Sequence, residues 1–245
     1  MNGLIVVEAE LNGKTGNFIM DSGANEIILN EKGAKHNEEF ITATGTVKSR
    51  KTKIRSLKVG SILKKKINGY TMDLSHLEDY LDRSVFGIIS LSSISKSYIT
   101  IDFNDQNLII SEFASTESID YQNEIQFSIV DDIPIYSFQH KRKTLNFIID
   151  TGATSHFVDL ETLKKHRISI KAKDIQKSIF TSSDEVENVN KYTSKTLEKA
   201  SVIISDFYPI DIEQGFSIPI HGLISLNTLS TEKVYIDVNA KTIFF

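Results

Sequence analysis

Two aspartates, Asp21 and Asp150, stand in nearly the same surroundings in the two halves of the 245-residue chain. Each follows an apolar run and precedes a hydroxyl residue, a glycine and an alanine. The two segments read Asn17-Phe-Ile-Met-Asp-Ser-Gly-Ala24 and Asn146-Phe-Ile-Ile-Asp-Thr-Gly-Ala153. A carboxylate that directly follows an apolar strand emerges at the end of a buried element, where a loop can present it to a substrate.

If the two segments meet about a twofold axis, the carboxylates of Asp21 and Asp150 cannot both ionise, so the pair holds one proton. The ionised member can act as a general base on water. The protonated member can polarise a carbonyl and later protonate a leaving amine. Gly23 and Gly152 allow a tight turn and the close approach of another backbone. The hydroxyls that can brace the two turns belong to Ser22 and Thr151.

The similarity of the two halves extends beyond the aspartates. Gly87-Ile-Ile-Ser-Leu91 recurs as Gly222-Leu-Ile-Ser-Leu226, and Ile101-Asp-Phe-Asn104 recurs as Ile236-Asp-Val-Asn239. Because the blocks keep their order, we interpret the chain as a duplicated unit rather than as a coincidence in an Ile-, Lys- and Asn-rich composition.

The boundaries of the two units follow from this repeat. A weaker match joins Leu57-Lys-Val-Gly-Ser-Ile62 to Leu197-Glu-Lys-Ala-Ser-Val202. Residues 113–123 are polar and lack a clear period, which is typical of a linker. We therefore predict an N-terminal lobe at 1–112 and a C-terminal lobe at 124–245.

Each unit is expected to be mostly strand, because short β-favouring runs lie near turn signals such as Asn12-Gly13. The expected strands include Glu8–Leu11, Asn17–Met20, Asn107–Ile110, Ile133–Phe138, Leu145–Ile149 and Lys241–Phe245. Short helices are expected at Ser90–Ile94, Ser225–Leu229, Thr154–His166 and Leu74–Leu81. We predict an all-β fold of two similar closed β-barrel lobes related by a pseudo-twofold axis, with few short helices.

The composition excludes several classes of protein. The absence of cysteine excludes disulfides, thiol nucleophiles and cysteine-based metal sites. A net charge of −4 gives no global reason to bind nucleic acid. No apolar run approaches the roughly 18 residues of a membrane span. The start lacks the parts of a signal peptide, although a removed export signal would leave the same start, so no compartment is assigned.

The two aspartate segments resemble the catalytic loops of the retropepsin and pepsin group of aspartic proteases. Phe18–Ala24 and Phe147–Ala153 carry this resemblance, together with the later blocks Val85-Phe-Gly-Ile-Ile-Ser-Leu91 and Ile220-His-Gly-Leu-Ile-Ser-Leu226. Both halves keep the family's order, so the resemblance covers nearly the whole chain. It implies an endopeptidase that acts on a peptide or protein substrate with neither cofactor nor metal.

The family's roles transfer to matching residues of this chain. Asp21 and Asp150 would share the catalytic water, Ser22 and Thr151 would form a hydroxyl brace, and the carbonyls of Gly23 and Gly152 would bind substrate backbone.

The residues that follow each glycine point to a subgroup. Ala24 and Ala153 stand where retroviral-type members carry Ala and pepsin-like members carry Ser or Thr. Since Ala cannot donate a hydrogen bond that would lower the pKa of the carboxylate, we expect a weakly acidic pH optimum. Asn25 and Thr154 stand where retroviral enzymes carry an Asp that contacts the substrate, so a similar contact would lack the charge.

Two further expectations follow from the resemblance. The flaps should lie between Ile41 and Val59 and between Ile179 and Leu197, although neither segment shows a Gly-rich tip. Retroviral enzymes build their dimer interface from terminal strands, and this chain supplies both halves itself. It should therefore be active as a monomer.

Several features outside the two loops are interpreted as structural rather than functional. His221 replaces an aliphatic residue and is interpreted as a partly buried, hydrogen-bonded histidine, with a pH-sensitive support beneath Asp150 as the alternative. His156 is interpreted as a surface residue or a pocket-lining one. Nine basic residues with no acidic one lie from Lys48 to Lys66, which favours a solvated hairpin face over an anionic partner.

Three functions compete at this point. The first is an active aspartic endopeptidase. The second is a catalytically weak peptide- or protein-binding module on the same fold, and the third is a structural interaction protein. Retention of both aspartates favours the enzyme.

Overall fold

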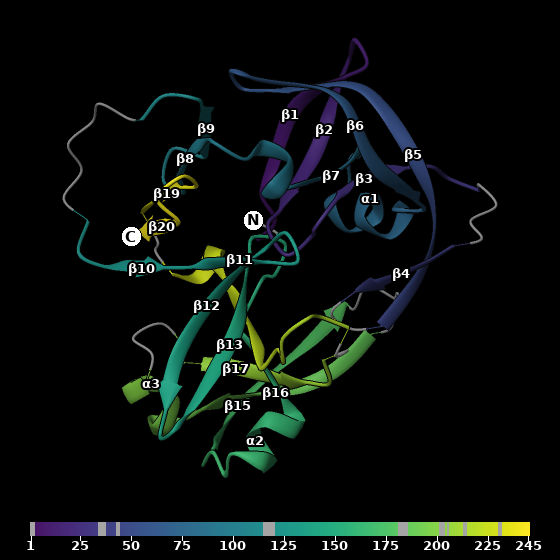
Figure 1. Cartoon of the computed structure of the whole chain (residues 1–245). Coiled ribbons are helices and arrows are strands. Elements are labelled where there is room, and N and C mark those ends of the chain that lie inside the picture. The colour runs from purple at the N-terminus through teal and green to yellow at the C-terminus, as the bar shows by residue number, and fades with distance from the viewer. Residues whose placement is uncertain are drawn as a thin grey trace.

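The computed structural model describes residues 3–33, 38–42, 45–114, 121–180, 186–200, 204, 206–212, 215–229 and 232–245. The fold is mostly β, as predicted (Figure 1). Its strands are β1 (Val6–Leu11), β2 (Lys14–Asp21), β3 (Ile27–Asn30), β4 (Glu38–Thr42), β5 (Gly45–Val59), β6 (Ile62–Met72), β7 (Gly87–Ser90), β8 (Tyr98–Asp102), β9 (Asn107–Ser111), β10 (Glu124–Gln126), β11 (Ser128–Val130), β12 (Ile133–His140), β13 (Lys143–Asp150), β14 (Phe157–Asp159), β15 (Lys171–Phe180), β16 (Val186–Thr193), β17 (Asp206–Ile210), β18 (Gly222–Ser225), β19 (Lys233–Asp237) and β20 (Thr242–Phe244). The helical segments are α1 (Ser75–Leu81), α2 (Leu160–Lys165), α3 (Lys195–Ala200), and two 3₁₀ turns, η1 (Ser92–Ile94) and η2 (Leu226–Thr228).

The strands of the first half form a closed barrel. Their sheet has the order β1-β2-β7-β3-β6-β5-β4, and β1 also pairs with β5, which closes six strands and leaves β4 as an extension. Phe18 and Met20 lie on the same face of β2, and together with Ile54 and Leu57 of β5 they belong to the main cluster of buried apolar side chains.

The second half repeats the central strand order of the first. In the first sheet β2 runs parallel to β7, β7 antiparallel to β3, and β3 parallel to β6. The eight-stranded sheet, β11-β12-β13-β18-β14-β17-β16-β15, has the same relations among β13, β18, β14 and β17. Among the described residues it has no pairing that closes it into a barrel.

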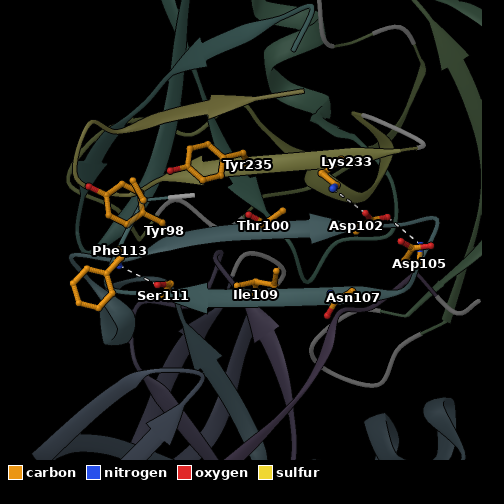
Figure 2. Close-up of a pocket in the computed structure, with 11 residues that line it drawn as sticks. Tyr98, Thr100, Asp102, Asp105, Asn107, Ile109, Ser111, Phe113, Lys233 and Tyr235 are labelled. Atoms are coloured by element: carbon orange, nitrogen blue, oxygen red, sulfur yellow. Dashed lines mark hydrogen bonds and ion pairs between the residues drawn. The ribbon is translucent and has the colours of Figure 1, made fainter. Parts of the chain in front are cut away.

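A third sheet joins the two halves. Its order is β10-β20-β19-β8-β9, so the two C-terminal strands β19 and β20 lie between strands from the middle of the chain. Tyr235 pairs with Thr100 at its centre, where β19 and β8 run antiparallel. One face holds a cavity of about 370 Å³, with Tyr98, Tyr235 and Phe113 toward one end and the Lys233–Asp102 ion pair toward the other (Figure 2).

The short helices lie close to where the sequence placed them. α1, η1 and η2 fall inside the expected segments, and the segment Thr154–His166 holds both β14 and α2. α3 was not expected. It also shows that the weaker repeat match is wrong, because Leu197 lies in this helix while Leu57 lies in β5. Part of the predicted linker, 115–120, lies outside the described residues.

Replacement of Gly87 by Ala should destabilise the barrel by about 3 kcal/mol, because overpacked sites of this kind relax poorly. A Cβ at Gly87 would lie 2.2 Å from the carbonyl oxygen of Ile28 in the neighbouring strand β3. Urea unfolding measures the effect. Gly33→Ala is the control, since its Cβ would meet nothing within 4 Å and only its φ of +65° is unfavourable. An equal loss in both variants would contradict the steric explanation.

Candidate active site

Asp21 and Asp150 end the equivalent strands β2 and β13, and each carboxylate organises the turn that follows it. Oδ1 of Asp21 accepts hydrogen bonds from the backbone N–H of Gly23 at 2.8 Å and of Ala24 at 3.2 Å. Oδ1 of Asp150 does the same with Gly152 at 2.7 Å and Ala153 at 3.1 Å. Each turn therefore fixes one carboxylate oxygen and leaves the other available.

The two turns are joined by the predicted hydroxyl brace. The Ser22 N–H donates to Oγ1 of Thr151 at 2.9 Å, and the Thr151 N–H donates to Oγ of Ser22 at 3.0 Å. Each hydroxyl then donates across to the strand before the other aspartate, Ser22 to the Ile149 carbonyl and Thr151 to the Met20 carbonyl, both at 2.7 Å. Both side chains are buried, so these four bonds are shielded from water.

The brace brings the two carboxyl groups into contact. They hydrogen-bond to each other. A Cβ at Gly23 would lie 2.8 Å from Cγ of Asp150, and one at Gly152 would lie 2.6 Å from Cγ of Asp21. Only glycine leaves room for the carboxyl of the opposite half at these two positions.

The environment of the pair favours the protonated form. Burial raises the pKa of Asp21, and the hydrogen bonds it accepts from Asp150 and from its own turn oppose that rise. Burial raises the pKa of Asp150 well above its ordinary value, and the neighbouring charge of Asp21 raises this pKa further. One proton shared between the two carboxyls is the physical result.

The next predicted residues flank the turns. Ala24 and Ala153 are nearly buried and offer no hydroxyl to the carboxylates. Asn25 and Thr154 are half-buried. The Asn25 carbonyl accepts from Oγ of Ser92 at 2.9 Å, and Thr154 packs against the backbone of Gly3. A contact between these four residues and a substrate stays a prediction.

Two histidines have roles that the sequence only partly indicated. His221 is half-buried, and its Nδ1 accepts from the Asn146 N–H at 3.1 Å, in the middle of β13 and four residues before Asp150. His156 is buried beside the second turn, which contradicts the surface interpretation. The signal for it was present: at the matching position of the first half stands the apolar Ile27.

Two hairpins occupy the segments predicted for the flaps. β4 pairs antiparallel with β5 in one, and β15 pairs antiparallel with β16 in the other; residues 43–44 and 181–185 connect these strands in the sequence. Both connections lie outside the described residues.

The basic stretch from Lys48 to Lys66 follows the β5–β6 hairpin. All its basic side chains except Lys64 are exposed, and two of them, Arg50 and Lys51, pair with Glu31 and Glu38. These positions fit the solvated face that the sequence favoured.

The described ranges hold no group of three metal-ligating side chains that could bind an ion. Within those same ranges, no helix has the length and apolarity needed to cross a bilayer.

Residues 7–90, which include Asp21 and end at the strand beside it, match the family model described as aspartyl protease. No curated protein matches the chain.

Proposed function

We propose that this chain, whose residues 7–90 match the aspartyl protease family, is an aspartic endopeptidase with one active site. Asp21 of the first half and Asp150 of the second would form its catalytic pair. The observation that carries the proposal is the contact between these two half-buried carboxyls, each held by its own turn and joined by the Ser22–Thr151 brace.

The chemistry follows from the shared proton. Ionised Asp21 takes a proton from a water that sits between the carboxyls, while protonated Asp150 donates to the carbonyl oxygen of the scissile peptide. Water attacks the carbonyl carbon and a tetrahedral diol forms. Asp21 then transfers its proton to the amide nitrogen while one hydroxyl of the diol returns a proton to Asp150. The C–N bond breaks, the amine and the new carboxylic acid leave, and the starting pair is restored.

The substrate would bind as an extended strand between the pair and the two hairpins, so that main-chain hydrogen bonds give affinity and side-chain pockets give specificity. Gly23, Gly152, Asn25 and Thr154 are the proposed backbone contacts. The proposal also includes a duplicated architecture with lobes at 1–112 and 124–245. The matching strand order of the two halves supports it. Activity as a monomer is supported by the third sheet, which one chain completes from both halves.

The test is cleavage of a peptide mixture across a range of pH, beside an Asp150→Ala control. We expect cleavage with a weakly acidic optimum, because both carboxyls have raised pKa values and neither Ala24 nor Ala153 donates a hydrogen bond to them. Pepstatin should raise the melting temperature by occupying the same site. Cleavage only in strong acid would contradict the expected optimum. No cleavage by the folded protein and no pepstatin shift would favour a binding module.

A further inference from the structure

His156 closes a ring of hydrogen bonds behind the turn that carries Asp150. Its Nδ1 accepts from the backbone N–H of Ser225 at 3.1 Å, and its Nε2 lies 3.0 Å from Oγ1 of Thr228. That hydroxyl already donates to the Ser225 carbonyl at 3.0 Å. Nε2 must therefore donate to Thr228, and the ring fits only a neutral histidine with its proton on Nε2.

The ring reaches the carboxylate through one more residue. Ser225 lies beside Asp150 in the register of β18 with β13. Its Oγ donates to the Ala153 carbonyl at 2.7 Å, and the Ala153 N–H donates to Oδ1 of Asp150 at 3.1 Å. Three hydrogen bonds, linked through the covalent frames of Ser225 and Ala153, thus connect the imidazole to the second aspartate.

The first half lacks this device. Ser90 lies beside Asp21 as Ser225 lies beside Asp150, and Ser93 donates to the Ser90 carbonyl at 2.6 Å as Thr228 does to Ser225. The position that matches His156 is occupied by Ile27, a buried residue without a polar atom in its side chain. Of the two aspartates, Asp150 alone is therefore connected in this way to an imidazole.

The surroundings oppose a charge on the imidazole. Burial and the positive charge of Lys191 on β16 lower the pKa of His156 to about 4. Asp206 on β17 acts in the opposite direction, but it is engaged in ion pairs with Lys191 and Lys173 at 2.7 Å each. Protonation of Nδ1 would remove the acceptor for the Ser225 N–H and break the ring.

We propose that His156 is a positioning residue for Asp150: as a neutral ring it holds Ser225 and Ala153 in place, and its protonation releases them. This inference rests on the proposed endopeptidase function. It explains the loss of activity at low pH by protonation of the imidazole as well as by protonation of the carboxyl pair.

The test compares three variants over pH. In His156→Asn, the amide oxygen can accept from Ser225 at any pH, so the acid limit of kcat/KM should move down by about one pH unit. His156→Ile copies the first half and should lower kcat about tenfold at all pH values. His221→Asn is the matched control, because His221 also accepts from a backbone N–H but has no bond to the turn. An acid limit that His156→Asn leaves unchanged would overturn the proposal and leave the protease function intact.

A second measurement does not need activity. Nitrogen-15 NMR of the wild-type ring should show an unprotonated Nδ1 at pH 6, and its titration should shift the Ser225 and Ala153 amides and the Asp150 carboxyl carbon together. In His156→Asn, the change in the Asp150 carboxyl shift that accompanies the titration of the ring should vanish. A proton on Nδ1 at pH 6, or a ring that titrates without moving Asp150, would refute the inference even for a chain that cleaves nothing.

Discussion

Asp21→Asn and Asp150→Asn should each lower peptide hydrolysis by about 10³-fold or more at every pH. An amide oxygen can still accept the two N–H bonds of the turn, so the loop keeps its shape. It cannot, however, hold the proton that the mechanism moves between water, carbonyl and amine. The loss should appear in kcat, since the backbone contacts proposed for the substrate are unchanged.

The same variants should change stability in a predictable direction. A carboxyl whose folded pKa is raised contributes its full stability below the unfolded value of about 3.8 and loses it as pH rises through the folded pKa. Asn stays neutral throughout. Asp150→Asn should therefore be more stable than the wild type at pH 7 and no more stable at pH 3, as measured by urea unfolding at both values.

Asp79→Asn is the matched control, since Asp79 is an exposed residue of α1. It should alter neither cleavage nor the pH dependence of unfolding. Cleavage retained by either active-site Asn variant would remove the corresponding aspartate from the mechanism. A stability gain at pH 7 shared with Asp79→Asn would show that burial of the pair is not its cause.

The aspartate turns could be predicted because their determinants are local. Phe18 and Phe147 are buried, the carboxylates accept hydrogen bonds from the turns, and the glycines face the opposite aspartate. The immediate surroundings therefore determine which residue type each position requires. The same reasoning found the 3₁₀ turns after β7 and β18. These elements keep their sequence because the packing around them is equivalent in both halves.

The parts that the sequence did not reveal depend on distant partners. The three residues of β10 have no strong strand signal, and they pair only because β20 supplies an edge at the other end of the chain. α3 replaces strand in a region where the two halves differ. The apolar Ile27 at the matching position indicates that His156 is buried, but the bonds of His156 to Ser225 and Thr228 could not be predicted because they depend on contacts in space. Comparison of the two halves does not reveal such contacts, because it detects only the features that the halves have in common.

Ser22→Ala and Thr151→Ala should each destabilise the protein by about 3 kcal/mol, because each leaves buried backbone groups unpaired. Loss of the Ser22 hydroxyl leaves the Thr151 N–H and the Ile149 carbonyl without their hydrogen-bond partner. Loss of the Thr151 hydroxyl leaves the Ser22 N–H and the Met20 carbonyl without their hydrogen-bond partner. Thr151→Ser is the control: it keeps every bond and removes only a methyl group, so it should cost about 1 kcal/mol.

Urea unfolding of both single variants and the double variant forms a cycle that measures whether the two hydroxyls act together. They bond to each other's backbone and not to each other, so near-additive losses would mean that each joins the halves independently. A double variant that loses much less than the sum would mean that one broken side already releases the other. Losses as small as that of Thr151→Ser in all variants would show that water replaces the brace.

The brace also sets the distance between the two carboxyls. It therefore affects the pKa of the pair as well as the stability of the fold. The pKa of Asp150 is raised partly by the charge of Asp21, an effect that weakens as the turns separate. A brace variant kept folded at low temperature should therefore show a lower pKa for Asp150. Since the protonated form of Asp150 is the one that polarises the substrate carbonyl, the upper limit of the pH–rate profile should move toward acid. A profile that keeps its shape in folded Thr151→Ala would mean that the hydroxyls serve folding alone and that the turns hold the pair without them.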